Sequence, residues 1–224
     1  MATLTTPAWE RPDVVGSFAR SAPNPALMAY AHRHRCAWFA TRVLDVGCGA
    51  GRNAIPLASH GFEVIGVDWS RPMLEAAAQR DTARRLMLVH SPMDALPVRS
   101  NSIDLVIAHG IWNLARSGDE FRRATKEAAR VTCPGGNLFV FTFSRQTLAA
   151  GATPVIGEHF VFTQFSGAPQ VFLTGEQLVE ELRAVGFEQD ADLPIRELNL
   201  PQPGRVRIGV PVIFEAGFRK TGGG

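Results

Sequence analysis

Three carboxylates, each following a short apolar run, are the residues in this sequence best suited to chemistry. Asp45 stands directly before a glycine-rich turn that ends at Gly51, Asp68 ends a second apolar run, and Asp94 follows a third. Carboxylates accept hydrogen bonds and attract cations. Residues at the carboxyl ends of parallel strands meet at one edge of a sheet. We therefore expect the three acids to converge on one ligand.

The position of Asp45 favours a cationic ligand. It lies two residues before Gly47, where a dinucleotide site would place an anionic pyrophosphate against the following helix. S-adenosylmethionine carries an ammonium and a sulfonium group and no phosphate, so it matches this acid better. The run Gly49–Ala54 also satisfies the G-x-G-x-x-A form of the dinucleotide fingerprint, so the turn alone leaves both cofactors open. We expect Cys48, inside the turn, to act through its backbone and as a small packing residue.

The other two acids favour an adenosine ligand. Asp68 can accept hydrogen bonds from both ribose hydroxyls in either cofactor class. Its neighbour Trp69 either stacks on the adenine ring or caps the core. Asp94 can accept from the adenine amino group, while the backbone near Met93 contacts a ring nitrogen.

From Arg42 onward, β-rich runs alternate with helical patterns, which is typical of parallel strands joined by crossover helices. The expected strands are Arg42–Val46, Glu63–Val67, Leu86–His90, Ile103–Ala108, Asn137–Phe143, Ala191–Leu198 and Val206–Arg219. The expected helices are Gly51–His60, Arg71–Gln79, Asp119–Val131 and one from Thr174 to about Val185, with Arg122, Arg123, Lys126 and Arg130 on the outer surface of the third. The fold class is therefore α/β, doubly wound around a mostly parallel sheet.

Two segments do not fit this alternation. Residues 1–40 hold four prolines and an Ala-rich segment, Ala26–Phe39, that is expected to be helical. They form either a cap over the open end of the sheet or a helix that only packs on it. Residues 145–173 form an insertion rich in glycine, proline and phenylalanine. We expect the main domain to span 41–224, with a lid-like insertion at about 145–173.

Composition narrows the class of protein. The 224 residues carry a formal net charge of +2 with acids and bases interspersed, so the basic footprint of a nucleic-acid binder is missing. Three scattered cysteines suit a reducing compartment, and no signal peptide or apolar stretch long enough to span a bilayer is evident. The sequence predicts a cytoplasmic protein with a small-molecule partner and no membrane partner. It indicates no oligomeric state.

Four motifs together resemble the class I S-adenosylmethionine-dependent methyltransferase family, in particular its small bacterial members. They are a D-x-G-C-G-x-G turn, a V-D-x-S strand end, an acid-A-x-x-L-P loop and a P-G-G before the fifth strand, at Asp45–Gly51, Val67–Ser70, Asp94–Pro97 and Pro134–Gly136. The similarity runs from about Arg42 to Phe143.

The resemblance implies a seven-stranded sheet in the order 3-2-1-4-5-7-6, with an antiparallel last strand and helices on both faces. It also implies that Asp45, Gly47 and Gly49 border the methionine part of the donor, that Asp68 binds the ribose, and that Asp94 with Met93 meets the adenine. His109, after the fourth strand, matches the position that lines the donor and faces the acceptor.

Methyl transfer requires mainly alignment of acceptor, methyl carbon and sulfur, so a general base is optional. His109 is the first candidate for a base or else part of the pocket wall, and His159, in the insertion, is the second. The His32-x-His34-x-Cys36 run puts neighbours on different helix faces, so we expect no metal site. Arg52 either contacts a carboxylate or is solvated.

The expected acceptor pocket is aromatic and draws on the N-terminal segment, the loop after the fourth strand and the insertion. Its expected residues are Phe18, Tyr30, Trp38, His109, Trp112, Asn113, His159, Phe160, Phe162 and Phe165. Two other classes remain open: an NAD-dependent oxidoreductase, and a non-catalytic protein that binds S-adenosylmethionine. Asp45, the Asp94–Pro97 loop and the lack of a Tyr-x-x-x-Lys pair disfavour the oxidoreductase.

Overall fold

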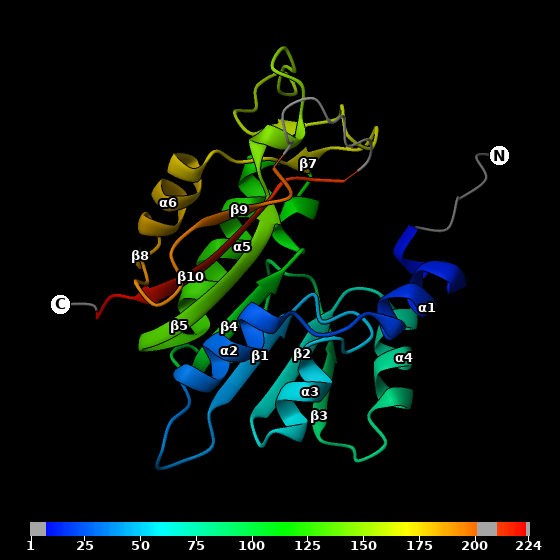
Figure 1. Ribbon diagram of the computed structural model, residues 1–224, viewed down its shortest axis with the longest axis vertical. Helices are drawn as coiled ribbons and strands as arrows, with labels where there is room; N and C mark the ends of the chain where they lie inside the picture. Colours follow the sequence, from blue (N-terminus) through cyan, green and yellow to red (C-terminus); the bar gives the residue numbers. More distant parts are fainter. Residues whose placement is uncertain (1–7, 201–209, 223–224) are drawn as a thin grey trace. The chain divides into compact units, whose positions relative to one another are not determined.

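The computed structural model describes residues 8–200 and 210–222 and divides into two compact units, Met1–Met93 and Asp94–Gly224 (Figure 1). Each unit is described by itself. Among the described residues, no helix is both long and apolar enough to cross a membrane.

Three parallel strands form the sheet of the first unit. They are β1 (Arg42–Val46), β2 (Glu63–Asp68) and β3 (Leu86–His90), in the order β3-β2-β1. Asp45 pairs in register with Gly66 of β2. All of β1 after its first residue is buried, so its aliphatic side chains belong to the core.

Two helices pack on these strands, α3 (Ala54–Ser59) and α4 (Arg71–Arg80). The hydroxyl of Ser70 accepts from the backbone N–H of Met73 and so caps α4. We expected α3 to begin at Gly51. It begins at Ala54, because Gly51 takes φ +77°, which no right-handed helix contains.

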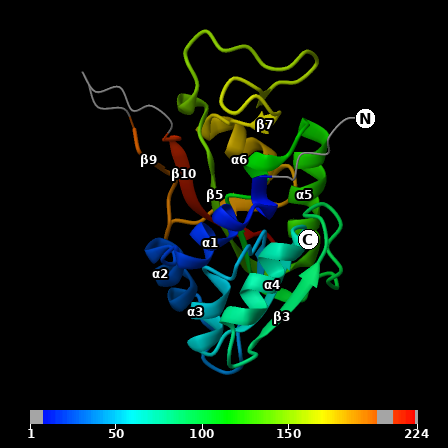
Figure 2. The same cartoon turned by 90° about the vertical axis from the view of Figure 1, so that its right-hand side faces the viewer.

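The N-terminal segment forms η1 (Ala8–Glu10), α1 (Pro12–Arg20) and α2 (Pro25–Arg33), and α1 lies against α4 (Figure 2). The helix expected over Ala26–Phe39 was wrong at its end, because α2 stops at Arg33 and a loop follows. The prolines start helices here. Pro12 and Pro25 occupy first-turn positions, where the missing N–H has no intrahelical partner to lose.

In the second unit, the main strands are β4 (Ile103–His109), β5 (Thr132–Phe143), β10 (Ile213–Lys220) and β8 (Phe187–Gln189), in that spatial order. Strands β4 and β5 are parallel, whereas β10 runs antiparallel to both β5 and β8. The first unit thus has the expected order 3-2-1. In the second unit, β8 is the expected sixth strand and β10 the expected seventh, so the order is the expected 4-5-7-6. The α/β fold class is confirmed.

The last strands differ from their expected bounds. We expected a strand over Ala191–Leu198, but that segment supplies only β9 (Arg196–Leu198), and β8 precedes it directly after Gly186. A turn and Pro194 interrupt the run between them, because proline cannot donate to a strand ladder. The final strand begins at Ile213, and the expected start at Val206, like the turn at Pro201 and Pro203, lies outside the described residues.

Two helices complete the second unit, α5 (Gly118–Val131) and α6 (Gly175–Arg183). The expected capping box of α6 is confirmed, since the Thr174 hydroxyl accepts from the N–H of Gln177 and the Gln177 side chain accepts from the N–H of Thr174. The helix ends at Arg183, and Gly186 shortly after it has a φ of +88°.

The insertion folds around its own aromatic core. It comprises η3 (Arg145–Thr147), β6 (Val161–Phe162) and β7 (Gln170–Val171), and β6 pairs with β7. The rings of Phe143, Phe162, Phe165 and Phe172 contact one another at centroid distances of 5.3–6.1 Å. Strand β7 also packs against η2 (Trp112–Leu114).

Candidate functional site

The glycine-rich turn after β1 presents bare backbone. Gly47, Gly49 and Gly51 all have positive φ. A Cβ on Gly51 would lie 2.8 Å from Ile55, whereas a Cβ on Gly49 would meet only the Met73 sulfur, at 3.8 Å. Gly51 is therefore required by packing, and the space beside Gly49 is open enough for a ligand.

Asp45 is the most unusual polar residue in the first unit. It is 1% exposed, and neither carboxylate oxygen has a hydrogen-bond partner among the described residues. Burial raises its pKa to about 7, with a further increase from Asp68 and a small opposing effect of Arg52. A buried polar group without partners costs free energy, so a ligand with a cationic hydrogen-bond donor would stabilise this carboxyl.

Asp68 is held in place by backbone amides. Its Oδ2 accepts from Gly49 N and its Oδ1 from Ser70 N, both at 2.8 Å. Burial raises its pKa, although these hydrogen bonds favour the charged form. Each oxygen keeps a second lone pair, so the carboxylate can accept from two adjacent hydroxyls.

Trp69 follows and is 64% exposed as a residue. The ring stacks on His90 with centroids 4.8 Å apart and planes 17° from parallel, and His90 Nε2 lies 2.8 Å from the Trp69 carbonyl oxygen. His90 thus supports one face of the indole. An exposed, supported aromatic face is the arrangement that base stacking requires.

Two further predicted residues, Cys48 and Met93, lie in the first unit. Cys48 is buried and its sulfur fills the space over Gly66, 2.8 Å from where a Cβ would stand. Burial raises the pKa of its thiol, so the thiol stays protonated and Cys48 packs rather than reacts. Met93, half-buried, ends the first unit.

The link between the turn and the N-terminal segment was not anticipated. Arg52 Nε donates to the Ala22 carbonyl at 2.6 Å, and the Asn24 N–H donates to Asn53 Oδ1 at 3.0 Å. Arg52, which is half-buried, therefore has a partner in the N-terminal segment, and its contact with a ligand carboxylate stays a prediction. Nothing in the local sequence signals bonds to residues about thirty positions away.

In the second unit, Asp94 is ion-paired. Its Oδ2 lies 3.0 Å from Arg123 Nε. The loop continues along α5, where Leu96 N donates to Glu127 and Arg130 donates to the Leu96 carbonyl. Sequence reasoning placed Arg123 and Arg130 on the outer surface of the helix. Their spacing of seven, with Glu127 between them at i+4, is the signal that could have revealed a shared face.

His109 ends β4, half-buried, with its ring stacked on Phe141 at 4.1 Å. His159 lies exposed in the insertion. His32 contacts His60, at 3.3 Å between ring nitrogens, whereas the His34 ring packs edge-on against Tyr30.

Much of the expected aromatic pocket is core. Trp112 is 1% exposed and packs on Phe121, which also contacts Phe160. Tyr30, Asn113 and Phe162 are buried as well, whereas Phe18, Trp38 and Phe165 are exposed. The Oδ1 of Asn113 has no partner among the described residues, unlike most buried amide oxygens.

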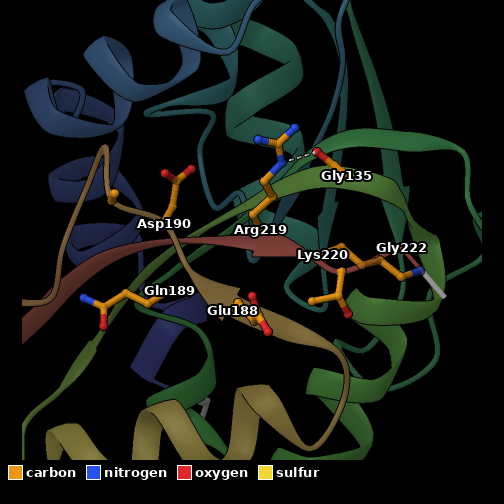
Figure 3. Close-up of a pocket in the computed structure, with 9 residues that line it drawn as sticks. Gly135, Glu188, Gln189, Asp190, Arg219, Lys220 and Gly222 are labelled. Atoms are coloured by element: carbon orange, nitrogen blue, oxygen red, sulfur yellow. Dashed lines mark hydrogen bonds between the residues drawn. The ribbon is translucent and has the colours of Figure 1, made fainter. Parts of the chain in front are cut away.

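A pocket of about 410 Å³ lies elsewhere in the second unit, lined by residues that include Gly135, Asp190 and Arg219 (Figure 3). The pocket residue Gly135 lies toward the start of β5, whereas His109 pairs with Phe141 near its end. The Arg219 Nε already donates to the Gly135 carbonyl. This pocket therefore lies toward the other end of β5 from His109, and both of its cations, Arg219 and Lys220, already donate to backbone carbonyls.

Comparisons with known proteins agree with the motifs. A family model described as a methyltransferase domain matches residues 44–140. A demethylmenaquinone methyltransferase of Corynebacterium urealyticum is 32% identical over 66% of this chain and 67% of its own length. The same enzyme of Renibacterium salmoninarum is 37% identical over 47% of this chain, and the match spans only 43% of that relative.

A solved structure shows the same fold. The S-adenosylmethionine-dependent methyltransferase of Methanosarcina mazei superimposes with a TM-score of 0.70, covering 90% of this chain and 99% of that one, at 21% identity.

Proposed function

We propose that this protein transfers the methyl group of S-adenosylmethionine to a small-molecule acceptor. The premise is that the chain belongs to the class I S-adenosylmethionine-dependent methyltransferase family. The observation that carries the proposal is Asp45, a fully buried carboxyl with both oxygens unpartnered among the described residues. Such a group favours a ligand that brings hydrogen-bond donors and positive charge. The ammonium group of the donor supplies both.

The neighbouring residues suit the rest of the donor. Asp68 is held by Gly49 and Ser70 so that its remaining lone pairs can accept from the ribose hydroxyls. The exposed face of Trp69, supported by His90, can stack on the adenine. Asp94 keeps one oxygen outside its pair with Arg123 to accept from the adenine amino group. The donor residues of the predicted site therefore fit this cofactor.

The bound donor supplies an activated methyl group, which passes to the acceptor nucleophile as the carbon–sulfur bond breaks and S-adenosylhomocysteine forms. The protein's part is alignment and exclusion of water. His109, held by its stack on Phe141, is the proposed residue at the acceptor side. For a hydroxyl or amine acceptor it can take the proton that the acceptor loses.

An apolar ring compound is the acceptor class that we propose. Relatives named demethylmenaquinone methyltransferase support a ring acceptor of the quinone kind. His159, exposed in the insertion after β5, remains a second candidate base.

Calorimetric titration with S-adenosylhomocysteine, and in parallel with NADH, tests the donor assignment. We expect binding of the first alone in the wild type and loss of that binding in Asp45→Asn. Glu75→Gln, the same charge change at an exposed position of α4, is the matched control and should bind normally. Binding of NADH alone would overturn the proposal, and donor binding without turnover on any acceptor would favour a non-catalytic binder.

A further inference from the structure

Trp69 lies in the first unit between two residues that are held in place. Asp68 before it accepts from Gly49 N and Ser70 N, and Ser70 after it caps α4. The backbone of Trp69 is therefore fixed, whereas the residue as a whole is 64% exposed. An exposed side chain that nothing restrains changes rotamer within nanoseconds. Stacking a base on such a ring costs the conformational entropy of ordering it.

A histidine on the neighbouring strand restrains this ring. His90 ends β3, which lies beside α4 (Figures 1 and 2), and pairs in register with Asp68, which ends β2. Its ring stacks on the Trp69 indole, with centroids 4.8 Å apart and planes 17° from parallel. Its Nε2 lies 2.8 Å from the Trp69 carbonyl oxygen. A carbonyl oxygen only accepts, so Nε2–H donates this bond and orients the imidazole.

The stack leaves one face of the indole for a ligand. In the described part of the chain, His90 supplies the one aromatic ring that contacts Trp69. This ring covers one face, and the exposure of Trp69 shows that the other side remains accessible. Adenine is bonded directly to the ribose, so a donor whose ribose is bound by Asp68 brings its base within reach of the next residue. The open face is therefore the position for adenine.

A second route from His90 to the donor runs through Asp68. Burial raises the pKa of Asp68, the backbone hydrogen bonds of Ser70 and Gly49 lower it, and the nearby His90 lowers it least among these causes. This electrostatic route is therefore the weaker one, whereas the stack and the hydrogen bond both join His90 to Trp69. The two routes are separable, because only one of them needs the indole.

We propose that His90 is a positioning residue for the methyl donor: it holds the Trp69 indole in the orientation in which adenine stacks on the open face. This role rests on the proposed function and deepens it. Because the ring is ordered before the donor arrives, binding costs less conformational entropy, and His90 raises the affinity without touching the donor.

A double-mutant cycle measured by calorimetric titration with S-adenosylhomocysteine tests this role. We expect His90→Ala to weaken binding about fivefold, which corresponds to the cost of ordering one side chain. His90→Phe keeps a ring against the indole and should restore most of the affinity. In a Trp69→Ala background, His90→Ala should change the affinity by less than about twofold, because the ring through which it acts is gone. His60→Ala, at another exposed histidine of the first unit, is the matched control and should bind like the wild type.

The orientation of the ring can be followed without a donor. Labelling with fluorotryptophan gives one fluorine resonance for each of the four tryptophans, and the Trp69 signal is the one missing from Trp69→Ala. In His90→Ala this resonance should shift and narrow, because the indole loses its stacked neighbour and moves faster. In His90→Phe the line should stay as broad as in the wild type.

Three results would overturn the role of His90. They are a donor affinity of His90→Ala equal to that of the wild type, an equal loss in the Trp69→Ala background, which would place the effect at Asp68, and an unchanged Trp69 resonance in His90→Ala. If the wild type binds no S-adenosylhomocysteine, the proposed function fails and this role with it. If the wild type binds normally and the cycle shows no coupling, only the role of His90 fails.

Discussion

The turn after β1 and the insertion after β5 use their unusual residues in opposite ways. In the turn, Asp45 is buried without a hydrogen-bond partner among the described residues, and the space beside Gly49 is open. In the insertion, phenylalanines such as Phe162 and Phe172 pack on one another. The Glu158 carboxylate accepts from the N–H of Gly118 at the start of α5. The difference teaches that a ligand site is found where internal partners are missing, not where aromatic residues are frequent.

Replacing Asp45 should reveal the energetic cost of the unpartnered carboxyl. Its pKa in the folded protein is about 7, above the ordinary 3.8, so the folded state holds a proton that the unfolded state releases between these values. The free energy of unfolding therefore falls as pH rises from about 4 to about 7, by up to ~4 kcal/mol from this group. Asp45→Asn should remove that fall. Urea denaturation at pH 5 and pH 8 measures it, and equal pH slopes in both proteins would contradict the assignment.

Asp68→Ala should show the next largest effect on donor binding, after Asp45→Asn. The variant loses the proposed bonds to two ribose hydroxyls, and hydrogen bonds to a charged group contribute about 1.5–3 kcal/mol each, so affinity for S-adenosylhomocysteine should fall at least ~100-fold. Calorimetry gives the affinity and circular dichroism the folding. A folded variant with unchanged affinity would sink the site assignment.

Trp69→Ala tests whether an exposed ring in the first unit acts as a stacking surface. Loss of one base–aromatic stack should weaken donor binding about tenfold. Trp38→Ala removes the side chain of a residue that is 92% exposed in the loop after α2 and should leave binding unchanged. Equal effects of the two variants in the same titration would show that Trp69 has no specific role.

Arg123→Gln should have the smallest effect. The pair with Asp94 has an arginine side chain that is 57% exposed, and such pairs contribute less than about 1 kcal/mol. We expect a small decrease in thermal stability and a donor affinity within about threefold of the wild type, since Asp94 itself remains. A loss as large as that of Asp68→Ala would mean that Arg123 positions the Asp94 loop for the donor.

The sequence by itself determined the first strands and the glycine-rich turn, because these depend on local patterns. Val43, Leu44 and Val46 are apolar, and the glycines after this run permit the positive φ that the turn needs. The bounds of β1 and β3 agree with expectation to the residue, and the Thr174 capping box was evident from a spacing of three residues.

Only the tertiary structure decided which polar and aromatic side chains have partners. The bonds from Arg52 to Ala22, from Arg123 to Asp94 and from Glu158 to Gly118 join residues about thirty to forty positions apart, and no local pattern signals such pairs. Burial is likewise a property of the packed chain. It made Trp112 a core residue rather than a pocket wall, and it left the buried Asp45 carboxyl without a hydrogen-bond partner among the described residues.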